Sequence, residues 1–168
     1  MKKLWVSICL IALVFALSAG ALAVPSSVSY DTTRRFLEYC DENDIKYSYM
    51  GIDNDNDEKV NLSFDLTNTS VDVRYFFEED QESCMVRVWN LITFDPDQIA
   101  EVRDAVGRAN ADYRWVKYYI DESDNTVTCA ADIYFGGGDA GDICGYILRR
   151  VVNISDSVYD DYLGQYNQ

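Results

Sequence analysis

The chain has 168 residues, which is the length of one domain with room for a short extra segment. Acidic residues outnumber basic ones by 29 to 14, and the net charge of −15 argues against a nucleic-acid ligand, because phosphates would be repelled. The sequence contains no histidine, which excludes Ser-His-Asp and Cys-His catalysis and most catalytic zinc sites.

Residues 1–23 have the pattern of an export signal. Lys2 and Lys3 precede an uncharged run over residues 4–19, and residues 21–23 (Ala-Leu-Ala) match a small-x-small cleavage site. The run is shorter than the roughly 20 apolar residues of a membrane span. We therefore expect cleavage before Val24 and an extracellular or cell-envelope location for a bacterial protein, without membrane insertion. A retained N-terminal anchor is the alternative.

The first half of the remaining chain predicts one helix and four strands. Residues 24–31 are polar, and we expect a disordered lead-in there. A helix follows over 32–43, where Phe36, Leu37 and Cys40 recur at helical spacing. Apolar and polar residues then alternate along four segments, as they do in half-buried strands: 46–52, 60–66, 71–77 and 84–93. Their short connections predict an antiparallel meander.

The second half predicts a helix, two strands and a last helix. Asp95 is placed as the N-cap and Pro96 as the first residue of a helix that continues to about Ala109. Strands over 113–120 and 127–133 flank a turn, and a glycine-rich loop leads to a helix that starts near Asp142. Residues 161–168 are expected to be a polar tail that frays. The order α-β-β-β-β-α-β-β-α predicts an α+β domain over 32–160, with helices on one side of a twisted antiparallel sheet.

This order resembles the YbjN-like family from about Thr33 to Tyr159. The stretches that carry the resemblance are Arg35-Phe36-Leu37, the alternating strand 60–66, Arg108-Ala109-Asn110, the hairpin 120–127 and the apolar last helix. The family's fold is similar to that of type III secretion chaperones, which bind extended segments of partner proteins. The family carries the label of a sensory transduction regulator and offers no catalytic residues to carry over. The export signal departs from the usual cytoplasmic members.

Two motif-like segments fail as ligand sites. Residues 53–57 supply the first three Asp ligands of an EF-hand, but Glu58 stands where Gly is needed and Phe64 where a bidentate carboxylate is needed. An Asp/Asn-rich turn is expected there, with a weak calcium site as the alternative. Residues 136–141 satisfy G-x-G-x-x-G, but too few residues follow for a dinucleotide-binding fold. We expect a flexible strand-to-helix connection.

Four cysteines follow the leader: Cys40, Cys84, Cys129 and Cys144. Export permits disulfides, and four cysteines allow three pairings. Buried, unpaired side chains are the other interpretation, because Cys40 and Cys129 fall on apolar faces of their elements.

Aromatic residues are dense in the strand over 113–120, and we expect a partner-binding surface formed by this strand and the glycine loop. Its residues are Tyr113, Trp115, Tyr118, Tyr119, Gly136, Gly137 and Gly138. We therefore expect a non-enzymatic, chaperone-like or regulatory module that binds another polypeptide, or a second copy of itself, with no cofactor, metal or catalytic residues. The alternatives are a module for calcium or carbohydrate, and a hydrolase that uses two carboxylates.

Overall fold

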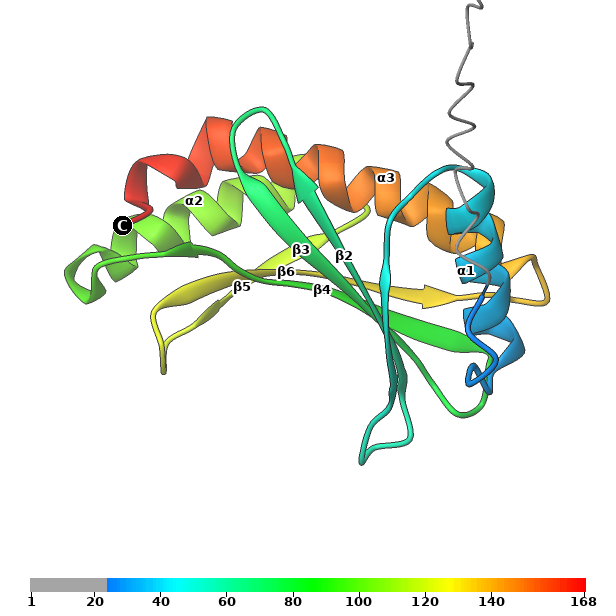
Figure 1. Ribbon diagram of the computed structural model, residues 1–168. Helices are drawn as coiled ribbons and strands as arrows, with labels where there is room; N and C mark the ends of the chain where they lie inside the picture. Colours follow the sequence, from blue (N-terminus) through cyan, green and yellow to red (C-terminus); the bar gives the residue numbers. More distant parts are fainter. Residues whose placement is uncertain (1–23) are drawn as a thin grey trace, which may run out of the picture.

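The computed structural model describes residues 24–168, so the expected leader over 1–23 lies outside the described residues. Six antiparallel strands form one sheet in the order β1-β2-β3-β4-β6-β5. Figure 1 shows the helices on one face of this sheet, with α3 running along it, while the other face is open. The predicted α+β class and helix placement are therefore confirmed.

The elements follow the predicted order. Their bounds are α1 Asp31–Glu42, β1 Ser48–Ile52, β2 Glu58–Asp65, β3 Ser70–Phe77, β4 Ser83–Thr93, α2 Ile99–Asp112, β5 Lys117–Asp121, β6 Thr126–Tyr134 and α3 Ala140–Val158. A short 3-10 turn, Pro96–Gln98, precedes α2, and Asp95 caps it by accepting from the N–H of Asp97. In the described part of the chain, no helix is both long and apolar enough to cross a membrane.

The core lies between the helices and the covered face of the sheet. Phe36 of α1 packs on Tyr75 and Phe77 of β3, with ring centroids 4.4 and 5.7 Å apart. The Tyr75 hydroxyl donates to the backbone carbonyl of Cys144, 2.9 Å away, and so ties α3 to the sheet. The alternation along β2 and β3 predicted these inward-facing positions, because successive strand side chains point to opposite faces.

Residues 24–30 are packed against the sheet, which corrects the expectation of a disordered lead-in. Val28 is buried, and the backbone N–H groups of Ser29 and Tyr30 donate to the carboxylate of Glu58 at 2.7 and 3.0 Å. Glu58 is fully buried and also accepts from the Tyr49 hydroxyl at 2.6 Å. A polar segment is thus held by a buried acceptor on β2.

The C-terminal residues do not fray, contrary to expectation. Helix α3 continues as a π-helical turn over Tyr159–Leu163 and a 3-10 turn over Gly164–Tyr166. Leu163 is fully buried, and the Gln168 N–H donates to the carbonyl of Thr93 on β4 at 3.0 Å. Leu163, the tyrosines that pack beside it and the bonds to Thr93 together dock the end of the chain.

Strand β5 begins at Lys117, four residues later than the aromatic pattern predicts. Beside this start, the side-chain oxygen of Asn110 in α2 accepts from the Tyr118 N–H at 2.8 Å, and its amide group donates to the Tyr118 carbonyl at 2.7 Å. These bonds tie the outer edge of β5 to α2, and residues 113–116 form a connection rather than a strand. β5 is consequently much shorter than β6.

Candidate functional site

The short β5 leaves part of β6 without a neighbour. β5 pairs with residues 126–130 of β6, whereas β4 pairs with β6 from Thr126 to Tyr134 on the other side. Among the described residues, no strand covers Ala131–Tyr134 on the β5 side. This four-residue segment is hereafter the open edge of β6.

The backbone groups of the open edge can be assigned a direction. The Phe135 N–H donates to the Glu82 carbonyl toward β4, at 2.8 Å. Because the N–H and C=O groups of successive strand residues point to alternate sides, those of Asp132 and Tyr134 point away from β4, to the uncovered side. They are therefore placed to pair with an added strand.

An apolar groove of about 530 Å³ runs beside the open edge, between β6 and α3. Ile133 of β6 forms one wall, and Ile143 and Ile147 of α3 form the other. The remaining lining residues are Arg114, Trp115, Asp132, Tyr134, Asp142 and Tyr146. The groove thus places apolar side chains next to unpaired backbone groups.

Two aromatic rings form the end of the groove near β5. Trp115 and Tyr146 meet edge to face with centroids 5.6 Å apart, and their side chains are 50% and 38% exposed. Arg150 lies over both rings, 5.9 Å from the Trp115 centroid and 5.1 Å from that of Tyr146, and donates to the Tyr146 hydroxyl. These contacts hold the rings in a fixed orientation, so a ligand can pack on them with little loss of side-chain entropy.

The aromatic residues expected to form one surface are distributed over four places. Trp115 lies in the groove, and Tyr119 is exposed on the open face of the sheet. Tyr113 is half-buried where α2 ends. Tyr118 is only 3% exposed and points into the core, where burial raises the pKa of its phenol. Tyr118 therefore cannot contact a partner in the folded chain.

The glycine loop shapes the far end of the groove. Gly136 and Gly137 have positive φ angles of 58° and 79°, which glycine adopts without strain. At Gly138, an added Cβ would lie 2.8 Å from the Cδ1 atom of Ile143. Glycine at this position therefore lets the loop lie directly against a groove wall. The loop also lines a separate polar hollow with Tyr134.

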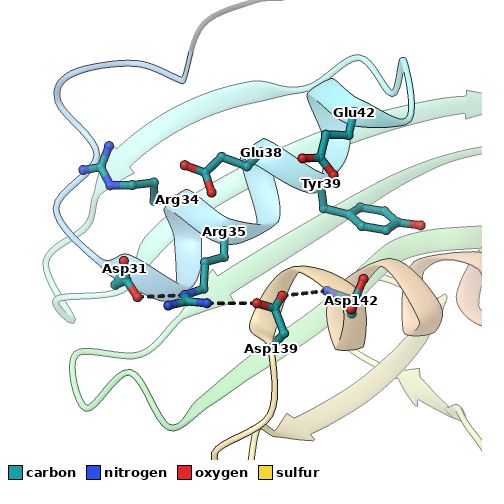
Figure 2. A pocket seen from close by; sticks show the side chains of 8 residues that line it. All are labelled: Asp31, Arg34, Arg35, Glu38, Tyr39, Glu42, Asp139 and Asp142. Carbon is teal, nitrogen blue, oxygen red and sulfur yellow. Dashed lines mark hydrogen bonds and ion pairs between the residues drawn. The ribbon is translucent and has the colours of Figure 1, made fainter.

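A second, polar hollow of about 410 Å³ lies between α1 and the start of α3 (Figure 2). Arg35 bridges Asp31 and Asp139 at 2.8 and 2.9 Å, and Asp139 caps α3 by accepting from the Asp142 N–H. That backbone bond, followed by the bond from Arg35, lowers the pKa of Asp139. Asp31, Arg35 and Asp139 are thus engaged with one another, and we interpret this hollow as a clamp between two helices.

The Asp-rich turn behaves as predicted for a turn. Asp53 accepts from the N–H groups of Asp55 and Asp57 at 2.8 and 3.0 Å and forms an ion pair with Lys59 at 2.7 Å. The bond from Lys59 lowers the pKa of Asp53. The carboxylate that would begin a calcium loop is therefore already occupied. Over residues 24–168, no group of three or more acidic or cysteine side chains has the arrangement of a metal site.

The other exposed tryptophan of the described residues, Trp89, lies on the open face of the sheet. Phe76 packs edge-on against it, and the Arg74 guanidinium lies 5.1 Å from its centroid. Lys59 lies over Phe76 in turn. These contacts cover ring surface on which a sugar would stack, so the geometry favours the groove over this face as the binding site.

Sequence reasoning identified Trp115 and missed the rest of the groove. Ile133, Ile143 and Ile147 were expected only as apolar positions of a strand and a helix. The groove exists because β5 is shorter than β6 and because α3 lies beside the resulting gap. The sequence does not predict the short β5, because its aromatic pattern continues over residues 113–116, and these residues lie outside the sheet.

A sequence model of the YbjN family, described as "Putative bacterial sensory transduction regulator", matches residues 33–162. None of the curated proteins matches the chain. YbjN from E. coli has a similar structure, with a TM-score of 0.54, 14% identity, and coverage of 79% of this chain and 89% of that one. The HopA1-SchA chaperone-effector complex gives a TM-score of 0.49 at 10% identity, covering 77% of this chain and 94% of that one. At these identities the structural likeness concerns the fold alone. The family match covers most of the chain, which therefore belongs to the YbjN family.

Proposed function

We propose that this protein is a non-enzymatic module that binds an extended segment of another polypeptide in the groove beside β6. The observation that carries the proposal is the juxtaposition of the open edge of β6 with an apolar groove. A bound segment would add a strand by pairing with the backbone of Asp132 and Tyr134. Its side chains on the helix-covered side would enter the groove against Ile133 and Ile143.

The walls of the groove favour binding over catalysis. Six of the nine lining residues are isoleucine or aromatic, and such side chains bind by burial of apolar surface rather than by proton transfer. The carboxylate of Asp132 is engaged by Arg87 at 2.9 Å and is directed to the open face of the sheet. A two-carboxylate hydrolase receives no support from this arrangement.

The shape of the open edge favours a single extended segment over a second folded copy. β5 flanks residues 126–130 on the same side as the open edge. A second copy that paired through its own open edge would bring its β5 alongside, where the glycine loop and α3 already lie. An isolated segment has no such neighbour.

The proposal can be tested with random 12-residue peptides displayed on phage and selected on the immobilised chain. The variant is Trp115→Ala, and the matched control is Trp89→Ala, because Trp89 is similarly exposed but lies on the opposite face of the sheet. Selected peptides should carry apolar residues at alternate positions. Their affinity should fall at least about tenfold with Trp115→Ala and should be unchanged with Trp89→Ala.

Hydrogen exchange locates the bound peptide. Peptide binding should slow exchange of the Asp132 and Tyr134 amides, because these would become donors to the added strand. If Trp115→Ala binds the selected peptides as well as the unchanged chain does, or if protection appears at β1 instead, the proposed site is wrong. If the chain without peptide is a dimer in which the Asp132 and Tyr134 amides are already protected, the open edge binds a second copy instead.

We propose further that the module acts outside the cytoplasm, on the strength of the leader pattern over residues 1–23. N-terminal sequencing of the protein from a bacterial culture should give Val24 in the envelope or medium fraction. Recovery of the intact chain from the cytoplasm alone would refute this part and leave the groove proposal standing.

A further inference from the structure

Two of the four buried cysteines lie against each other across the core. Cys84 is near the start of β4, and Cys144 is in the second turn of α3. Their Sγ atoms are 3.8 Å apart, and both side chains are buried. They are separated by about 60 residues of chain, so their contact joins the sheet to the helix that covers it.

The distance between the sulfur atoms is within reach of a covalent bond. A disulfide places its sulfurs about 2.05 Å apart, so the two atoms must approach by roughly 1.8 Å. Staggered side-chain rotations about the Cα–Cβ bonds can supply a movement of this size without moving a backbone. The neighbouring bond from the Tyr75 hydroxyl to the Cys144 carbonyl fixes this part of α3 over the sheet.

The other two cysteines have different surroundings. Cys129 of β6 lies beside Tyr118 and Ser155, and its thiol is fully buried there. Cys40 of α1 is also buried and interacts electrostatically with the Cys144 thiol, but the sulfur contact that Cys144 makes is with Cys84. Of the three pairings that four cysteines allow, the structure therefore singles out the one that joins Cys84 to Cys144.

We propose that Cys84 and Cys144 form a disulfide when the chain folds in the presence of a small-molecule disulfide such as oxidised glutathione. In the first step, one cysteine thiolate attacks the glutathione disulfide and releases one glutathione thiolate. The second cysteine, as its thiolate, then attacks the mixed disulfide and releases the other. Two protein thiols are thereby oxidised to one disulfide, and one glutathione disulfide is reduced to two thiols, with two protons passing to the leaving thiolates.

The reaction belongs to folding rather than to the folded state. Both sulfurs are shielded from solvent once α3 covers the sheet, and burial raises the pKa of the Cys144 thiol well above its ordinary value. Exchange with a glutathione disulfide therefore requires the partly folded chain. This inference is independent of the peptide-binding proposal and fails or succeeds separately from it.

The experiment is oxidative refolding of the full chain with Cys9→Ala, so that the leader contributes no thiol. The reduced chain is refolded in a glutathione redox buffer, its free thiols are counted, and its peptides are mapped by mass spectrometry without reduction. We expect two free thiols instead of four and a cross-linked peptide pair containing Cys84 and Cys144. The melting temperature should rise by roughly 10 °C over that of the reduced chain, because the cross-link constrains the unfolded state.

Matched variants separate the cross-link from general effects of losing a buried thiol. Cys84→Ala and Cys144→Ala should each abolish the cross-linked pair and the difference in melting temperature, whereas Cys129→Ala should keep both. Peptide mapping of the chain that keeps both Cys84 and Cys144 tests the proposal even if one of these variants fails to fold. Four free thiols in a folded, oxidatively refolded chain would overturn the proposal, and so would a cross-link between Cys40 and Cys144.

Discussion

Replacing Glu58 by Gln tests whether a buried carboxylate holds the N-terminal segment on the sheet. One carboxylate oxygen accepts from the Ser29 N–H and the Tyr49 hydroxyl, and the other accepts from the Tyr30 N–H. A glutamine can place its single oxygen at the first position only. Its NH₂ group would then face the Tyr30 N–H. Both groups are hydrogen-bond donors, so the bond that Tyr30 makes to the Glu58 carboxylate would be lost.

The cost follows from these three bonds. A hydrogen bond to a charged group contributes about 1.5–3 kcal/mol, so losing the bond from Tyr30 accounts for about 2 kcal/mol. The two remaining bonds change from a charged to a neutral acceptor and lose roughly 0.5 kcal/mol each. The free energy of unfolding should therefore fall by about 3 kcal/mol, which corresponds to a melting temperature lower by roughly 6–12 °C.

Urea unfolding of the two chains measures this difference. Glu79→Gln is the matched control, because Glu79 is exposed and accepts a single side-chain bond from Asn56 at 3.3 Å. The control should change the unfolding free energy by less than about 0.5 kcal/mol. If Glu58→Gln has as small an effect as the control, the carboxylate does not anchor residues 24–30, and the reasoning is refuted.

Three further predictions concern the close contact of two helices, a capping carboxylate and the buried thiols. Gly141→Ala should lower the unfolding free energy by about 1–3 kcal/mol, because the new Cβ would lie 2.6 Å from a backbone carbonyl oxygen of α1. Gly107→Ala, which meets nothing within 4 Å in α2, should instead raise it by about 0.5–1 kcal/mol; equal effects in calorimetry would contradict the close packing. The folded pKa of Asp139 is lowered, so its contribution is present above the unfolded pKa and is lost as the pH falls through the folded value. Asp139→Asn should therefore reduce the acid dependence of stability below pH 3.8, and an unchanged pH profile would exclude this contribution. Burial raises the pKa of Cys40 to about 12, so iodoacetamide should label it at pH 8 roughly a thousandfold more slowly than in urea; equal rates would contradict its burial.

The local pattern predicted the elements well where the chain alternates without interruption. Strands β2 and β3 were expected over 60–66 and 71–77 and are observed as Glu58–Asp65 and Ser70–Phe77. The helix start at Asp95 was also predicted, because the cap and the following proline act within one turn. In these segments, the period of two or the capping bond is a property of neighbouring residues, which is why the sequence contains it.

The errors arose where a distant residue decides the local structure. The outer edge of β5 is held by Asn110 in α2, and the order of residues 24–30 depends on Glu58 in β2. Neither partner is adjacent in the sequence to the segment it holds. The groove has the same origin, because it requires β5 to end early and α3 to lie beside the uncovered strand.

The edges of the sheet also differ in how well they can accept another strand. β1 carries an irregularity between Tyr49 and Gly51, where the pairing register with β2 shifts, and Gly51 has a φ of 82°. Such irregularities twist an edge away from a new partner. β5 is five residues long, and Lys117 at its start is engaged with the backbone of Asn110 and Tyr113.

The open edge of β6 lacks these protections. It continues a regular strand that is held in register by β4, and the groove flanks it. An unprotected edge is a liability for aggregation, since it can pair with any exposed strand. The edge is only four residues long, and a net charge of −15 keeps copies of the chain apart. Both features lower the risk of aggregation without closing the edge. An edge that is short, regular and backed by fixed aromatic rings is the arrangement expected of a site for one extended segment.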